Sequence, residues 1–136
     1  MKNIISLTSV LLLSSCATKY IPPEKSNNTV ILNVIHTSDY QNSLTRVNGY
    51  DNQNCNFTEG FGRLATLGEK LLTPKKTNVR IKSNKQIFLT LSGSGNIDVN
   101  ASYYRKYSCS KFISFVPEAN VEYELSLSNP ELPTCS

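Results

Sequence analysis

Apolar and polar residues alternate along much of the chain after residue 28, which is the pattern of β-strands with one buried face. The alternation occurs in four segments: 29–35, 79–82, 87–91 and 97–103. It is clearest over residues 121–127, where four apolar residues alternate with three polar ones. We expect this last segment to be a half-buried antiparallel strand.

Turn-forming residues separate these segments. Residues 92–95, Ser-Gly-Ser-Gly, have the composition of a turn. Residues 117–120, Pro-Glu-Ala-Asn, separate a strand expected over 109–116 from the strand over 121–127. The sequence therefore predicts a hairpin in the C-terminal third, with Asn120 supplying a left-handed turn conformation.

The pattern is weaker between residues 50 and 74. Glycines at 60 and 62 suggest a bend, and residues 63–72 fit either a strand or a short helix. We favour a strand followed by a loop. About seven or eight short strands with polar turns then predict an all-β fold, an antiparallel β-sandwich over residues 29–136.

The first 15 residues have the organisation of a signal peptide. A short basic start with Lys2 precedes an apolar run over residues 4–13. As a helix this run would rise about 15 Å, which is half the hydrocarbon thickness of a bilayer, so it is too short for an ordinary membrane span. It leads into Leu13-Ser14-Ser15-Cys16.

This tetrapeptide resembles the lipobox of bacterial lipoprotein precursors, in which a branched apolar residue and two small residues precede an obligatory cysteine. The resemblance implies that diacylglycerol is attached to the Cys16 sulfur, that the chain is cut before Cys16, and that the new amine is acylated with a fatty acid such as palmitate. An ordinary secretory peptide with a cysteine nearby is the alternative. Ala17 stands where aspartate would favour the inner membrane, so we expect an outer-membrane anchor with the domain facing the periplasm.

Residues 16–28 are expected to be a lipidated, flexible tether. They contain Pro22 and Pro23 and no periodic apolar pattern. The membrane is thus one expected partner, reached through the lipid on Cys16.

The charge of the chain is mildly positive. It is +4 for 136 residues and +3 once Lys2 is removed, which is too little to imply a nucleic-acid partner. Basic residues do cluster between residues 75 and 85. A solvated strand face explains this cluster, and contact with lipid head groups or an acidic partner is the alternative.

Three cysteines remain for an oxidising compartment once Cys16 carries lipid. We expect a disulfide between Cys109 and Cys135, which would tie the tail to the penultimate strand, with Cys55 buried or free for an intermolecular bond. Pairing of Cys55 with Cys109 or with Cys135 stays open, since spacing does not determine connectivity.

No catalytic residue is assigned, and the chain is expected not to be an enzyme. His36 is the only histidine, and neither a framed serine nucleophile nor a pair of carboxylates accompanies it. No metal site and no cofactor are expected, because cysteine and histidine pairs with ligand spacing are missing from the sequence.

The segment Tyr103, Tyr104, Arg105, Lys106, Tyr107 is the candidate binding surface, because tyrosine and arginine are enriched at binding hot spots. A structural role at a strand end is the alternative. The following segment, residues 109–125, resembles the F-x-P-x-x-G-x-x-Y hairpin of small envelope lipoproteins of the sandwich type, with Asn120 in place of glycine. This resemblance implies the fold rather than an activity.

The sequence favours a membrane-anchored envelope lipoprotein that acts as a non-catalytic binding or structural accessory module for an envelope protein. Two alternatives remain. One is a periplasmic inhibitor of a cell-wall hydrolase, for which Ser92 and Gly93 would form the inhibitory loop. The other is an accessory lipoprotein of a secretion complex, by analogy of architecture alone.

Overall fold

The computed structural model describes residues 19–37, 43–56, 58, 60–69, 73–100 and 103–127. Within these ranges, the side chains of residues 97–100, 103–105, 107 and 127 are outside the description. The regular elements of this part are seven strands: β1 (Thr29–His36), β2 (Leu44–Tyr50), β3 (Gly62–Gly68), β4 (Lys76–Lys82), β5 (Ile87–Asn100), β6 (Tyr103–Phe115) and β7 (Tyr123–Leu127).

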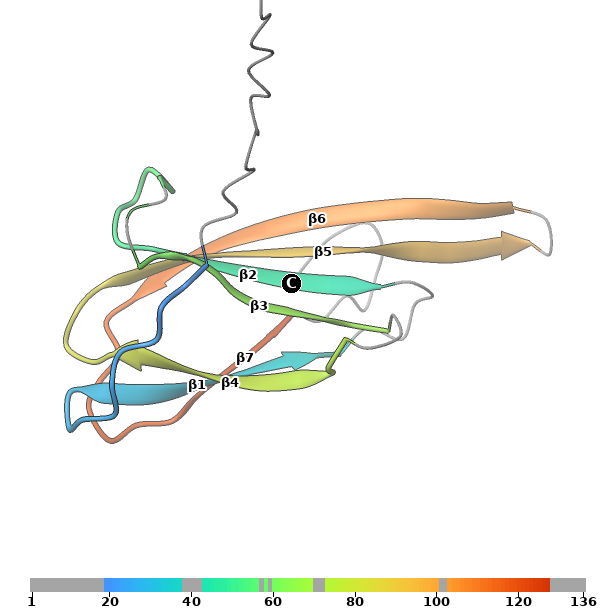
Figure 1. The fold of residues 1–136 in the computed structure, drawn as a ribbon. Coiled ribbons are helices and arrows are strands. Elements are labelled where there is room, and N and C mark those ends of the chain that lie inside the picture. The colour runs from blue at the N-terminus through green and yellow to red at the C-terminus, as the bar shows by residue number, and fades with distance from the viewer. Residues whose placement is uncertain are drawn as a thin grey trace, which may run out of the picture.

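These strands form two sheets, with the orders β4-β1-β7 and β3-β2-β5-β6 (Figure 1). The described part of the chain contains no helix. The prediction of an all-β sandwich is therefore confirmed.

The core lies between the two sheets and follows from the alternation along each strand. In β1 the residues Val30, Leu32 and Val34 are buried, whereas their neighbours are half-buried. Residues that meet them from the other strands are Val47, Ala65, Leu67, Val79, Ile81, Ile87, Leu89 and Leu91. Each buried valine, leucine or isoleucine side chain contributes roughly 1.5–3 kcal/mol when it leaves water, so this core is a large stabilising contribution to the sandwich.

The turn expected at residues 92–95 does not form. Gly93 lies within β5, where it is paired with Thr45 of β2 on one side and with Cys109 of β6 on the other. Hydrogen bonding to strands on both sides outweighs the local preference of serine and glycine for a turn.

The C-terminal hairpin prediction is also wrong, because β6 and β7 belong to different sheets. Residues 116–122 cross from one sheet to the other, with Pro117 fully buried and its carbonyl accepting a hydrogen bond from the Asn84 N–H at 2.7 Å. Strand β7 then pairs with β1 in parallel, not antiparallel, orientation. Asn120 does adopt the expected left-handed conformation, with φ of 63°.

The weak central region contains two strands. The strand favoured within residues 63–72 is present as β3. Strand β2 was not predicted. Its alternate buried residues are Thr45, Val47 and Gly49, and only Val47 among them is a large apolar residue, so the sequence shows no period of two.

The N-terminal segment differs from the expected tether. The segment 19–28 lies against the sandwich. The backbone of Lys19 forms an isolated parallel β-bridge with that of Arg63 in β3, and the Ile21 N–H donates to the Gly60 carbonyl at 3.0 Å. Tyr20 is only 7% exposed. The segment from Lys19 onward is therefore part of the folded domain, and burial of the Tyr20 ring stabilises its attachment.

Candidate functional site

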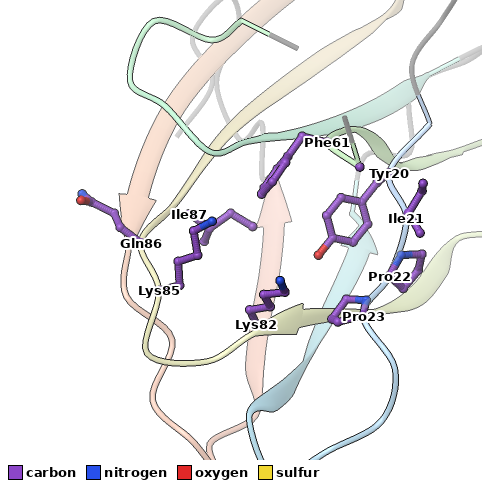
Figure 2. Close-up of a pocket in the computed structure, with 10 residues that line it drawn as sticks. Tyr20, Ile21, Pro22, Pro23, Phe61, Lys82, Lys85, Gln86 and Ile87 are labelled. Carbon is purple, nitrogen blue, oxygen red and sulfur yellow. The ribbon is translucent and has the colours of Figure 1, made fainter. Parts of the chain in front are cut away.

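A pocket of about 320 Å³ lies between the N-terminal segment and the connection from β4 to β5 (Figure 2). This size falls at the small end of the range found for ligand pockets. We call it the apolar pocket. The lining residues are Tyr20, Ile21, Pro22, Pro23, Gly60, Phe61, Lys82, Lys85, Gln86 and Ile87.

Aromatic side chains from distant parts of the sequence form one wall of the apolar pocket. The ring of Tyr20 packs edge-to-face on Phe61, with centroids 6.0 Å apart and planes at 69°. The Tyr20 hydroxyl donates a hydrogen bond to the Arg80 carbonyl at 3.2 Å. Burial raises the pKa of Tyr20 to about 12, so this hydroxyl is neutral and keeps its proton at physiological pH.

Two lysines supply the charge at this pocket. Lys82 ends β4, and Lys85 lies in the connection to β5, where Asn84 takes a left-handed conformation with φ of 56°. The Lys85 ammonium lies 5.7 Å from the centroid of the Phe61 ring, within the range of a cation–π contact. Figure 2 shows both lysines bordering the same space as Tyr20 and Phe61.

Neither lysine has an ion pair within the described residues. The salt bridge found there joins Lys75 to Glu69, at the opposite end of β4. The charge of Lys85 has only a weak effect on Asp51. The pKa of Asp51 is lowered first by a hydrogen bond from Asn52, and the charge of Lys85 makes the smallest contribution.

A second pocket of about 430 Å³ adjoins the first, and the two share Pro23 and Lys82. Its other lining residues are Ser26, Asn28, Thr29, Ser83 and Asn84, so we call it the polar pocket. Ser83 is 7% exposed, and its hydroxyl oxygen is buried without a hydrogen-bond partner among the described residues. A buried hydroxyl without a hydrogen bond destabilises the folded protein by about 1–3 kcal/mol, so a hydrogen bond from a ligand or water would be favourable at this atom.

His36 lies inside the sandwich and not at either pocket. Its Nδ1 lies 2.9 Å from the Thr45 hydroxyl, and its Nε2 lies 2.9 Å from the Ser43 hydroxyl. All three side chains are buried. The arrangement joins β1 of one sheet to β2 and its preceding residue in the other sheet, and it offers no open face to a substrate.

The predicted site residues that the structure describes do not line either pocket. Cys16 and Cys135 lie outside the described residues. Of the described cysteines, Cys55 carries a free thiol and Cys109 does not.

The segment that includes Tyr103, Tyr104, Arg105 and Tyr107 lies at the start of β6. It pairs with residues 95–100 of β5, whereas β2 pairs with β5 only up to Ser94. The two strands therefore extend beyond the rest of the sandwich as a two-stranded ribbon (Figure 1), with Lys106 exposed.

Sequence reasoning did not identify the apolar pocket. The composition of residues 16–28 predicts a tether that includes Tyr20 and Ile21, and the glycines at 60 and 62 predict a bend around Phe61. One signal was available: Tyr20 and Ile21 are adjacent large apolar residues in a segment that is otherwise small, polar or proline.

Groups of acidic, histidine and cysteine side chains able to hold a metal ion are not found among the residues that the structure describes. Within the described residues there is no helix that could cross a bilayer. Comparison with protein-family models, curated proteins and solved structures gives no match for this chain.

Proposed function

We propose that the protein is a non-catalytic binding module of the cell envelope, anchored in the outer membrane by lipid on Cys16 and facing the periplasm. The observation that carries this proposal is the attachment of residues 19–23 to the sandwich. Only Ala17 and Thr18 separate Cys16 from Lys19. Because an extended residue spans about 3.3–3.6 Å, a lipid on Cys16 would hold the domain within about 10 Å of the bilayer.

The buried state of the His36 side chain supports a binding role over a catalytic one. A general base must reach the proton that it abstracts. The imidazole is occupied by two buried hydroxyls instead.

The projecting ribbon is the proposed contact for an envelope protein partner, through Tyr103, Tyr104, Arg105 and Tyr107. Strand β6 is the last strand of its sheet. Edge strands present unpaired backbone groups, and partners use them to add a strand. Arg105 and the exposed Lys106 would favour an acidic partner segment.

A Cys109–Cys135 disulfide belongs to the same proposal. The free thiol of Cys55 supports it, since the two alternative pairings both require Cys55. The hydrolase-inhibitor alternative lacks the loop on which it depends, because Ser92 and Gly93 are paired within β5.

Lipid attachment is tested with Cys16→Ser in the full chain, with metabolic palmitate labelling and membrane fractionation as readouts. We expect the label to disappear and the protein to leave the detergent-soluble lipoprotein fraction. Cys55→Ser is the matched control and keeps both properties. A Cys16→Ser chain that still takes up palmitate would overturn the anchor.

Partner binding is tested by mild cross-linking in intact cells, followed by capture of the tagged protein. An alanine replacement of Tyr103, Tyr104, Arg105 and Tyr107 is compared with Lys76→Gln, a charge change at the far end of β4. Loss of one stoichiometric envelope protein in the first variant alone supports the accessory role. Recovery of the wild-type protein without any partner contradicts it.

A further inference from the structure

We propose that the apolar and polar pockets together bind one anionic lipid of the membrane. An acyl chain lies against Tyr20, Phe61 and Ile87, and the acidic head group lies at Lys82 and Lys85 next to the Ser83 hydroxyl. This inference rests on the proposed lipid anchor for the source of the lipid, and on the two pockets for its chemistry.

The apolar pocket fits a chain rather than a polar solute. Its walls are the aromatic rings of Tyr20 and Phe61, the side chain of Ile87, and the prolines at 22 and 23. Ile21 also lines it and is 66% exposed, so an apolar side chain that water now covers would gain from contact with a ligand.

The charge at the site selects an anion. Lys82 and Lys85 line the apolar pocket, and acidic side chains are missing from the described lining of both pockets. Lys82 lines both pockets, so this residue lies where a ligand would pass from the apolar to the polar pocket. An ammonium group is a compact partner for a phosphate or carboxylate head group.

Ser83 gives an observation independent of charge. It is more than nine-tenths buried, lines the polar pocket, and has a hydroxyl without a partner among the described residues. Its own backbone N–H is satisfied by the Asn28 carbonyl at 2.9 Å, so the open requirement belongs to the side chain. The hydroxyl oxygen is closed to solvent, so a head group would reach it only by displacing the side chains that cover it, and an oxygen that then accepts from the hydroxyl would supply its missing hydrogen bond.

The position of the pockets indicates a lipid source. The apolar pocket begins at Tyr20, four residues after Cys16. With lipid on Cys16, the site would lie within about 14 Å of the bilayer surface, so membrane lipids are the amphipathic anions nearest to it.

The test uses the full chain, exported and captured by a C-terminal tag in dodecyl maltoside, so that every variant carries the same anchor. Native mass spectrometry counts the molecules of dodecyl phosphate bound as its concentration rises. We expect one bound molecule per chain, and a Kd raised about tenfold or more in the double variant Lys82→Gln, Lys85→Gln. Lys76→Gln, which removes one positive charge at the other end of β4, leaves the Kd unchanged.

Two further variants separate the parts of the site. Ile21→Asn changes an exposed side chain and is expected to weaken binding of dodecyl phosphate without lowering the melting temperature. Ser83→Ala removes the unpartnered hydroxyl, so it is expected to maintain or raise the stability of the empty protein while weakening binding. Binding by either variant equal to that of the wild type contradicts its part of the proposal.

Inorganic phosphate distinguishes a lipid from a free anion. We expect it not to displace dodecyl phosphate at equal concentration, because it makes no contact with the aromatic wall. Displacement would overturn the lipid assignment, as would equal binding by the double lysine variant. These readouts do not depend on palmitate labelling of Cys16 or on capture of a protein partner, so failure here is distinct from failure of the proposed function.

Discussion

The imidazole Nε2 of His36 lies 2.9 Å from the hydroxyl oxygen of Ser43, and both side chains are buried between the two sheets. This contact and its counterpart to Thr45 hold β1 against the opposite sheet through polar groups, beside the hydrophobic core. Buried polar groups that are fully bonded fix one arrangement of neighbouring strands, because any other arrangement leaves them unpaired.

Replacing His36 with alanine is expected to destabilise the domain by about 2–4 kcal/mol, because it removes two buried hydrogen bonds and leaves a cavity. Urea unfolding followed by circular dichroism measures the effect. Binding of dodecyl phosphate per folded molecule should not change, since His36 does not line either pocket. An unfolding free energy equal to that of Lys76→Gln would show that the contacts do not stabilise the fold.

Tyr20→Phe is expected to cost about 1 kcal/mol at neutral pH through loss of the hydrogen bond to the Arg80 carbonyl. The pH dependence gives a second test. Because burial raises the pKa of Tyr20 from 10.0 to about 12, its contribution to stability is full below pH 10 and declines as the pH rises from 10 to 12. The difference between wild type and Tyr20→Phe should therefore shrink over that interval. A constant difference would contradict the raised pKa.

Gly68→Ala and Gly49→Ala form a matched pair in adjacent strands. A Cβ at position 68 would collide with the backbone carbonyl oxygen of Ser43, whereas at position 49 it would meet the end of the Leu64 side chain, which can move. We expect a loss of about 2–3 kcal/mol or more for Gly68→Ala and a clearly smaller loss for Gly49→Ala. Thermal unfolding of the two variants makes the comparison. A larger loss for Gly49→Ala than for Gly68→Ala would contradict the described packing of Gly68 against Ser43.

Thiol labelling tests the cysteine assignment. Because Cys55 carries a free, half-buried thiol, denatured protein without reductant should take up one maleimide, and Cys55→Ser should take up none. After reduction the chain should take up three if Cys16 carries the proposed lipid. Three labels before reduction would contradict the Cys109–Cys135 disulfide.

The sequence was sufficient to predict the strands that have one buried face and one more exposed face, because their apolar and polar residues alternate. Residues 29–35 are the clearest example, because every second residue is apolar and is buried on the face of β1 that points to the core. The same reasoning failed where pairing is decided at long range: Gly93 has local turn propensity but is held by β2 and β6, and the partner of β7 is β1 rather than its sequence neighbour.

The pockets were beyond sequence reasoning for a related reason. Tyr20 and Phe61 are 41 positions apart, and each stands in a segment with loop composition. Only the attachment of residues 19–23 beside β3 and β4 brings their rings together with Lys82. Ser83, likewise, looks like an ordinary turn serine until its burial is known.

The parallel pairing of β1 with β7 joins two strands that are far apart in the sequence, so the three-stranded sheet cannot be complete before β7 is in place. Leu32 is paired with Tyr123, so the first strand waits for a partner that comes almost a whole domain later along the chain. Contacts of such large sequence separation close slowly, because the entropy of the intervening loop is lost before they form. Until β7 is docked, the central strand β1 lacks one of its two neighbours, so we expect docking of the C-terminal strand to be a late step of folding.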